Sequence, residues 1–250
     1  MKSYKICVVL SLVLNLVSCK EPGAQYTNVV EISHDLEHKE VPNNESGVYK
    51  EFYKDGVLKI KGKYELGKKT GIWIDYNSIG EPEKAVYMYN DSVYYSGLDP
   101  QDYVLEKYPI KGKNVIDLPV KWDKGNIDNS SLLLTCTKKC KDQFCPTISI
   151  TYTKLKGSFH DLVEENIATT RKEFDYFKIV SGGEVKINNL RGEQYSCITI
   201  YNGIKLGLLA TFILKDDDVY IITSMALNDP EGSFLKYQDL FVEIASTFTL

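Results

Sequence analysis

The chain has 250 residues, of which 43 % are hydrophobic and 26 % charged, and its formal net charge is −4. This composition excludes collagen-like, low-complexity and disordered chains. The near-balanced charge provides no basic surface of the kind that phosphate backbones require, so we expect no nucleic-acid partner. The 18 tyrosines, against 9 phenylalanines and 2 tryptophans, favour strands and aromatic surfaces over helical bundles.

Residues 1–18 have the features of a signal peptide. Lys2 and Lys5 precede an apolar run from Ile6 to Val17 that is too short to span a bilayer. The run ends in Leu16-Val17-Ser18-Cys19, which resembles the lipobox of bacterial lipoproteins. The resemblance implies that the Cys19 thiol is acylated, with palmitate or a similar chain, and that the chain is cut before it. The alternative is an ordinary secretory signal that happens to contain a cysteine.

Removal of residues 1–18 would take away two lysines and no acid, so the formal charge of the mature chain becomes −6. Two or more acyl chains at Cys19 would attach the protein stably to a membrane through its N-terminus. Lys20, rather than an aspartate, follows the cysteine. By resemblance to enteric sorting rules, this leaves the outer membrane of a Gram-negative bacterium as the destination, on its periplasmic or its surface face.

Residues 19–46 are polar and interrupted by proline and asparagine, which predicts a flexible tether. Within it, residues 34–38 have the H-x-x-E-H spacing of inverted zinc proteases. On a helix, His34 and His38 would ligate zinc and Glu37 would act as base. The flanking sequence predicts no long amphipathic helix, so we expect a solvated tether and no metal. A metal-dependent hydrolase is the alternative.

Residues 47–92 contain an internal repeat. The segment 47–56 (GVYKEFYKDG) is followed 24 residues later by 71–80 (GIWIDYNSIG), and each unit predicts a strand, a turn that ends in glycine, and a second strand. With Gly62-Lys63-Tyr64 and the residues up to Trp73, the pattern resembles the MORN-type repeats of YwqK-like antitoxins. Two such units are few for an independent stack, so we expect this module to dock elsewhere or to gain an edge from residues 87–95.

The repeat module is rich in aromatic residues, for which two interpretations stand. They pack between the hairpins, or they form a contact surface for a partner. Packing is the simpler explanation for most of them. The candidate contact residues are Tyr49, Tyr53, Tyr64, Trp73 and Tyr76.

Residues 101–250 predict a second domain. Strand-like runs at 132–137 and 147–152 precede an amphipathic helix that begins after Ser158, followed by four strands between 185 and 225 and a terminal helix after Asp229-Pro230. This order predicts an α+β fold, with an antiparallel sheet covered by two helices. The segment Leu118-Pro119-Val120-Lys121-Trp122, the strands and the ending at Phe248 resemble the PsbP-like family, which includes DcrB-type proteins. The resemblance implies an α/β/α sandwich whose members mostly bind or assemble with other proteins.

Four cysteines remain after Cys7 and Cys19 are set aside: Cys136, Cys140, Cys145 and Cys197. Their even number in an exported chain predicts two disulfides, with three possible connectivities. Cys140 and Cys145 fall in one loop, which favours a local bridge between them and a second bridge between Cys136 and Cys197. A thiolate zinc site is the alternative, although the paired C-x₂-C spacing is absent.

Other reactive residues have simpler explanations. His160 lies beside Ser158 and Asp161 at a predicted helix start, where a capping cluster accounts for all three. The acids 216–218 fall in a hairpin turn and are expected to be solvated, and residues 181–183 (SGG) predict a turn between strands. We therefore expect no cofactor.

The sequence predicts a non-enzymatic, lipid-anchored envelope protein that binds another envelope or secreted protein. An effector-immunity factor and a secretion chaperone are alternatives suggested only by the two families that it resembles. Both act in the cytosol, which does not suit an exported chain.

Overall fold

The computed structural model describes residues 46–110, 114–125, 131–142, 144–230 and 233–249. Cys19, the motif His34, Glu37 and His38, the signal peptide and the tether up to residue 45 lie outside these residues. The described chain divides into two compact units. The N-terminal unit comprises residues 46–106 and Pro119–Lys121, and the C-terminal unit comprises Lys107–Leu118 and residues 122–249.

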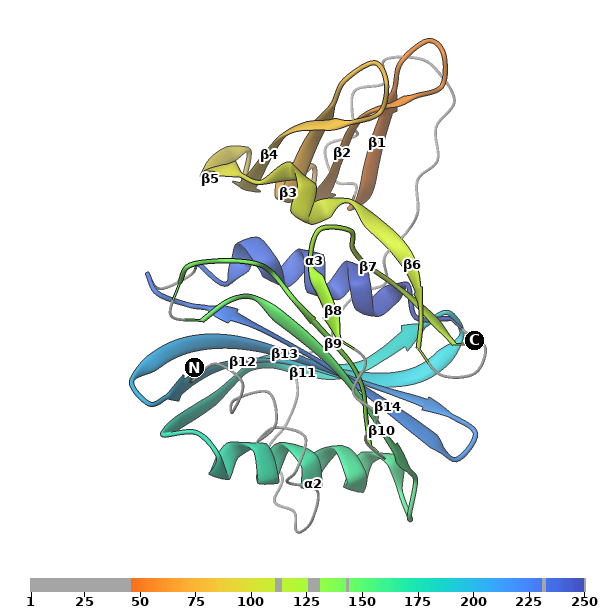
Figure 1. Ribbon diagram of the computed structural model, residues 1–250, viewed down its shortest axis with the longest axis vertical. Coiled ribbons are helices and arrows are strands. Elements are labelled where there is room, and N and C mark those ends of the chain that lie inside the picture. The colour runs from red at the N-terminus through yellow and green to blue at the C-terminus, as the bar shows by residue number, and fades with distance from the viewer. Residues whose placement is uncertain (1–45, 111–113, 126–130, 143, 231–232, 250) are drawn as a thin grey trace. The chain divides into compact units, whose positions relative to one another are not determined.

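The N-terminal unit is an antiparallel meander of five strands, each paired with the next (Figure 1). The strands are β1 (Gly47–Phe52), β2 (Leu58–Glu65), β3 (Lys68–Tyr76), β4 (Pro82–Tyr89) and β5 (Ser92–Leu98), followed by the short helix η1 (Pro100–Tyr103). The sheet thus extends past residue 92, and β5 supplies the additional edge that was predicted from residues 87–95.

The 24-residue repeat is visible in the backbone. Tyr53 N donates to the carbonyl of Val57 and Gly56 N to that of Tyr53, while Asn77 and Gly80 make the corresponding bonds 24 residues later. Gly56 has φ +85° and Gly80 has φ +84°, a conformation that glycine adopts without a steric penalty. The repeated glycine therefore sets the same turn in both hairpins.

Two short strands follow the first sheet. β6 (Leu105–Pro109) pairs with β7 (Val115–Pro119) in a ladder of their own. Just after β7, Val120 N donates to the carbonyl of Val104 at 2.9 Å. Residues 119–121 therefore belong to the N-terminal unit, although the residues on either side of them belong to the C-terminal unit. No local sequence pattern predicts this.

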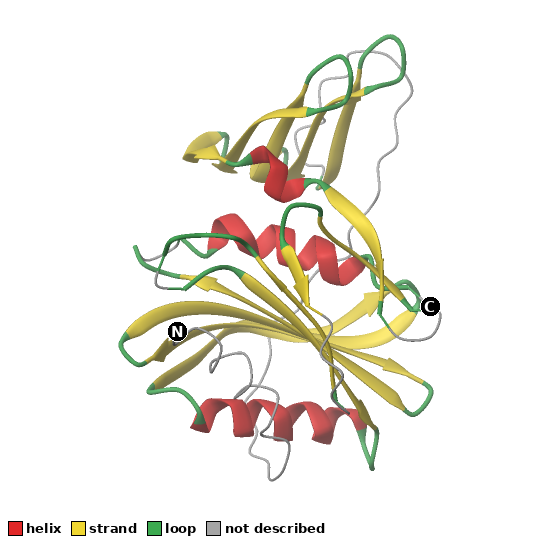
Figure 2. Cartoon of the chain, viewed as in Figure 1, coloured by secondary structure: helices red, strands yellow, loops and turns green. Residues whose placement is uncertain are grey.

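The C-terminal unit contains a seven-stranded antiparallel sheet in the order β11-β12-β13-β14-β10-β9-β8 (Figures 1 and 2). Its elements are β8 (Asp123–Gly125), β9 (Leu132–Thr137), β10 (Thr147–Lys154), α2 (Phe159–Lys172), β11 (Tyr176–Ile187), β12 (Leu190–Tyr201), β13 (Ile204–Lys215), β14 (Asp218–Leu227) and α3 (Leu235–Ser246). One helix covers each face of the sheet, so the predicted α+β class with an α/β/α sandwich is confirmed.

Strand alternation divides the core of this unit into two layers. Phe159, Val163 and Ile167 of α2 are buried with Leu208 and Phe212 of β13. On the other face, the ring of Phe234, at the start of α3, lies directly over Gly207 of β13. Ser158 accepts from Asp161 N at the start of α2, which confirms the predicted cap.

The predicted turn at residues 181–183 is wrong, because these residues continue strand β11. Gly182 pairs with Tyr195, and a Cβ on Gly182 would lie 2.3 Å from the Tyr195 ring. Gly182 thus makes room for a large neighbour within the sheet instead of ending the strand. In sequence these two uses of glycine look alike.

Candidate functional site

Three aromatic rings from three consecutive strands meet on one face of the N-terminal sheet. Tyr49 of β1 stacks on Trp73 of β3 with ring centroids 5.6 Å apart, and Tyr64 of β2 meets both rings edge-on at 5.5 and 5.2 Å. The ammonium group of Lys69 lies 4.3 Å from the centre of the Trp73 ring. Such pairs stabilise a sheet beyond the area that they bury.

The cluster behaves as a core rather than as an open surface. Trp73 is only 6 % exposed, and its indole N–H donates to the carbonyl of Thr70 at 3.1 Å. Burial raises the pKa of Tyr49 and of Tyr64 above the ordinary value. Of the five predicted contact residues, the structure thus brings three together as packing, which was the simpler interpretation for most of them.

The other two predicted contact residues form a separate pair. The Tyr53 hydroxyl donates to the backbone carbonyl of Tyr76 at 2.7 Å and so links the two repeated hairpins. The ammonium group of Lys59 lies 6.0 Å from the Tyr53 ring and 2.6 Å from Oε1 of Glu51. The bond from Tyr53 to Tyr76 thus joins the two repeats, whereas the contacts of Lys59 lie within the first hairpin.

The exposed aromatic surface of this unit lies elsewhere, on the β4–β5 hairpin. Tyr89, Val93 and Tyr94 are 58 %, 56 % and 54 % exposed. Tyr87 and Tyr95 pair across the two strands, and Tyr94 meets the Tyr95 ring edge-on at 4.8 Å. Val93 pairs with the buried Met88, so it points to the other face of the sheet from Tyr89. We name Tyr89, Val93 and Tyr94 the hairpin patch.

The turn between β4 and β5, next to the hairpin patch, is held by hydrogen bonds to β3. Asn90 and Asp91, with φ +48° and +66°, form the β4–β5 turn. Asp91 N donates to the carbonyl of Lys69, and Lys69 N donates to Oδ1 of Asp91 at 2.7 Å. These bonds fix the turn to the start of β3. The run Val93-Tyr94-Tyr95 was the sequence feature that could have indicated this patch. Strand alternation does not predict which of these side chains are exposed, because the pairing of β4 with β5 is irregular here.

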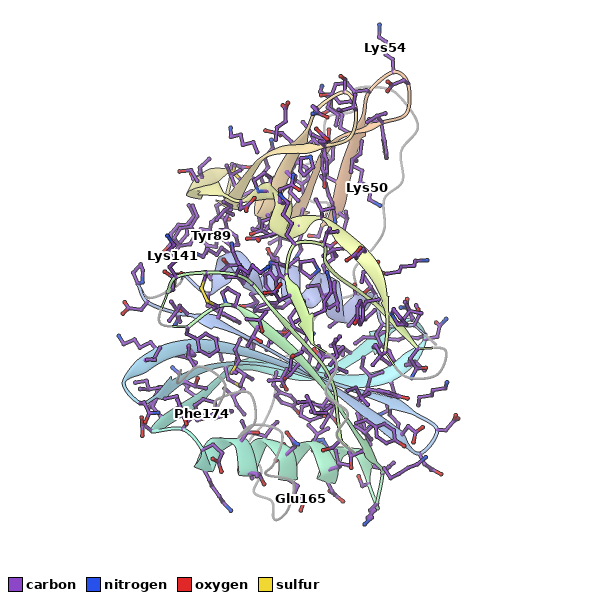
Figure 3. All side chains as sticks on the ribbon, in the orientation of Figure 1. Lys50, Lys54, Tyr89, Lys141, Glu165 and Phe174 are labelled. Carbon is purple, nitrogen blue, oxygen red and sulfur yellow. A yellow bond between two sulfur atoms is a disulfide. The ribbon has the colours of Figure 1, made fainter. Side chains whose placement is uncertain are left out.

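The disulfide predicted between Cys140 and Cys145 is present, with Cα atoms 5.7 Å apart, and Figure 3 shows it beside Lys141. The predicted bridge between Cys136 and Cys197 is wrong, because both are buried thiols. They lie on β9 and β12, which are four strand spacings, or about 19 Å, apart. A disulfide requires Cα atoms within about 7 Å.

The two thiols also point to opposite faces of the sheet. The cross-strand partners on one face run Cys136, Ile148, Ser224, Leu209 and Ser196. Cys197 is the next residue after Ser196, so its side chain points the other way. Burial raises the pKa of the Cys197 thiol to about 12, with a smaller opposing effect from Arg171.

A polar cluster that the sequence did not reveal lies between α2 and β12. Glu193 of β12 is 1 % exposed. Its carboxyl group accepts a hydrogen bond of 2.7 Å from the Tyr195 hydroxyl and lies 3.1 Å from Nδ1 of His160 on α2. Burial is the main cause that raises the pKa of Tyr195, and the bond to Glu193 adds to it. His160 therefore ties the first turn of α2 to the sheet, beyond the predicted capping cluster.

The acidic turn 216–218 is partly paired. Asp218 forms an ion pair with Lys154 and accepts from the Tyr152 hydroxyl at 3.0 Å. Among the described residues, no three His, Cys, Asp or Glu side chains are grouped so as to hold a metal ion. No helix in the described ranges is long and apolar enough to cross a bilayer.

No protein-family model matches this chain, and no curated protein sequence matches it either. Among solved structures, it is similar to cyanobacterial PsbP (CyanoP) from Synechocystis, with 10 % identity and a TM-score of 0.47 over 62 % of this chain and 96 % of that one. It is also similar to LpqN of Mycobacterium tuberculosis, described as involved in cell envelope biogenesis, with 14 % identity and a TM-score of 0.45 over 58 % of this chain and 90 % of that one.

Proposed function

We propose that this chain is a lipid-anchored protein of the bacterial cell envelope that binds another envelope or secreted protein and does not catalyse a reaction. The observation that carries the binding proposal is the hairpin patch, whose Tyr89, Val93 and Tyr94 are each more than half exposed. Figure 3 labels Tyr89 at the end of the N-terminal sheet. Tyrosine is enriched at protein interfaces because it offers a large contact area and loses little rotamer freedom.

The geometry of the hairpin patch supports this role. The rings of Tyr87, Tyr94 and Tyr95 pack edge-on against one another, and one backbone–backbone and one backbone–side-chain bond between Asp91 and Lys69 hold the turn. A contact surface that is ordered before binding loses less conformational entropy when the partner arrives. The patch is thus pre-organised for a partner.

The proposed compartment is supported by two independent features. The Cys140–Cys145 disulfide is typical of proteins outside the cytoplasm. The lipobox-like residues up to Cys19 follow a short apolar run. We propose the outer membrane of a Gram-negative bacterium as the membrane, and MORN-type repeats as the origin of the N-terminal sheet, on the shared turns of Gly56 and Gly80.

Site-specific photo-crosslinking tests the binding surface. A photoreactive phenylalanine replaces Tyr94 in one variant and Ile79 in a matched control, because Ile79 is 73 % exposed on the same unit but lies outside the hairpin patch. In the producing bacterium we expect one discrete protein adduct at position 94 and none at 79. Adducts at both positions, or at neither, contradict the proposal.

Metabolic labelling with an alkyne fatty acid tests the anchor. We expect the wild-type chain to be labelled and Cys19→Ala to be unlabelled and to remain an uncut precursor, because the acyl acceptor and the cleavage site are lost together. Equal labelling of both proteins contradicts the anchor without affecting the crosslinking result.

A further inference from the structure

A second exposed apolar surface lies on the C-terminal unit, at the start of its edge strand β11. Tyr176, Ile179 and Val180 are 46 %, 36 % and 58 % exposed within five consecutive residues. β11 is the outermost strand of the seven-stranded sheet. We name these three residues, with the half-buried Phe174 and Phe177, the β11 patch.

The half-buried aromatic rings of the β11 patch pack against one another and against β12. The ring of Phe174 lies 6.1 Å from that of Phe177 and 6.0 Å from that of Tyr201 on β12. The guanidinium carbon of Arg171, in the last turn of α2, lies 5.7 Å from the Phe177 ring. Figure 3 labels Phe174 beside the end of α2. Packed rings therefore support the face of the edge that carries Phe177 and Ile179.

The backbone of this edge is poorly suited to adding another strand. The ladder between β11 and β12 shifts register between Ile179 and Ser181, so Val180 has no cross-strand partner and bulges. Such bulges interrupt the regular row of backbone donors and acceptors that a further strand needs. A partner must therefore contact the side chains of this edge rather than extend the sheet.

The charges around the β11 patch are mostly positive. Arg171, Lys172 and Lys178 are exposed, against the acids Glu173 and Asp175. Lys205 joins them, because Tyr176 pairs with Ile200 and Ile200 pairs with Lys205 across the sheet. The whole chain, in contrast, has a formal charge of −4. Strand alternation places Tyr176, Lys178 and Lys205 on one face of the sheet and Phe177 and Ile179 on the other, so cations and apolar side chains line both sides of this edge.

We infer that the β11 patch docks on the anionic lipid surface of the membrane to which the protein is anchored, an inference that rests on the proposed lipid anchor. Tyrosine and phenylalanine rings suit the boundary between headgroups and acyl chains, Ile179 and Val180 supply apolar contact, and the four cations on the two sides of this edge attract the lipid phosphates. The 28 residues from Cys19 to Ser46 span at most about 95 Å between the acylated cysteine and the first described residue.

Bromolipid quenching tests this contact directly. The full-length acylated protein carries Val180→Trp in one variant and Ile79→Trp in the control, and the signals of Trp73 and Trp122 are subtracted with wild-type protein. Vesicles contain phosphatidylethanolamine and phosphatidylglycerol with brominated acyl chains, or phosphatidylcholine alone with the same chains. We expect at least a twofold loss of fluorescence at position 180 with the anionic vesicles and little loss at 79.

The charge requirement is tested by adding Lys172→Glu and Lys178→Glu to the Val180→Trp protein. Each cation near an anionic surface changes membrane affinity about fivefold, so the double change and 0.5 M salt should both abolish the quenching at 180. Equal quenching at 180 and 79, or none at 180, overturns the inference. Quenching that persists with phosphatidylcholine alone or after the charge reversal also overturns it.

Flotation of the same samples separates this inference from the proposed anchor. Protein that floats with vesicles of either composition without quenching at 180 retains the anchor and loses the docking surface. Protein that does not float loses the anchor, and quenching at high lipid concentration then still reports whether the β11 patch binds lipid. A photo-crosslink from position 180 to a protein would instead mark the patch as a protein interface and contradict the inference.

Discussion

The ring of Trp73 occupies the space in which a side chain at Gly62 would begin. A Cβ placed on Gly62 would lie 2.3 Å from Cδ2 of the indole, well inside van der Waals contact. The glycine in the middle of β2 is therefore what lets Tyr49, Tyr64 and Trp73 close over the sheet. Gly62 and Trp73 act as one packing unit.

Gly62→Ala should destabilise the N-terminal unit by about 1–3 kcal/mol, because the added methyl group overpacks the ring. Hydrogen exchange of the amides of β2 and β3 measures the loss. Gly62→Ala combined with Trp73→Leu is the control, since a smaller partner relieves the clash. Strictly additive effects of the two changes would contradict direct packing between these positions.

The oxidised protein should contain one disulfide and two thiols in the described chain. Intact mass under non-reducing conditions should be two protons below that of the reduced protein. Cys136 and Cys197 should be alkylated only after unfolding, because both are buried and burial raises the pKa of Cys197 to about 12. A mass four protons lower, or rapid alkylation of the native protein at pH 8, would show that the assignment is wrong.

Removal of the disulfide should lower the stability of the C-terminal unit modestly. The bridge closes a loop of only a few residues, for which the chain-entropy model gives about 2 kcal/mol. Cys140→Ser with Cys145→Ser should reduce the free energy of unfolding by about this amount in urea titrations. Cys136→Ser is a contrasting variant, since it buries a hydroxyl in place of a thiol and leaves the bridge intact. A double variant as stable as wild type would contradict a structural role for the bridge.

Tyr195 should make the protein sensitive to alkali. The pKa of Tyr195 is raised in the folded protein by burial and by its bond to Glu193, so the folded state keeps the proton longer than the unfolded state does. The stability that this contributes is complete below pH 10, the pKa of an unfolded tyrosine, and is lost as pH rises further toward the folded pKa. Tyr195→Phe should therefore lose less stability than wild type between pH 9.5 and 11.

Denaturant midpoints at each pH provide the measurement for Tyr195. Tyr220→Phe is a useful comparison, because the pKa of Tyr220 is also raised but its hydroxyl accepts from Asn114 rather than donating to a carboxylate. Parallel pH profiles for wild type and Tyr195→Phe would contradict the coupling of Tyr195 to Glu193.

The C-terminal part should fold without the repeats. Residues 101–250 carry a sheet that has a helix on each face, whereas residues 47–92 lack nearly all of the edge strand β5 that completes the five-stranded sheet. Expressed separately, 101–250 should unfold cooperatively and 47–92 should be largely disordered. In the intact chain, Trp73→Ala should loosen 47–92 in hydrogen exchange while Ile198 and Ile221 stay protected. A sharp unfolding transition of 47–92 alone would contradict this division.

Much of the fold follows from local pattern. The 24-residue repeat, the turns at Gly56 and Gly80, the cap at Ser158 and the strands of the second domain are set by residues close in sequence. Hydrophobic alternation and turn chemistry act over a few residues, so they can be recognised without tertiary information. The local bridge between Cys140 and Cys145 belongs with these features, because a single loop contains both cysteines.

Other features depend on strand order and register, which local pattern does not specify. Cys136 and Cys197 looked like partners, but β13, β14 and β10 separate their strands and they face opposite sides. Gly182 was predicted to lie in a turn, but it lies within β11, where the ring of Tyr195 covers it. Glu193 and His160 are 33 residues apart and meet only because α2 packs on β12. Composition and short motifs thus determined the class of fold and the predicted compartment, whereas the packing of distant segments decided which side chains meet and which aromatic residues stay exposed.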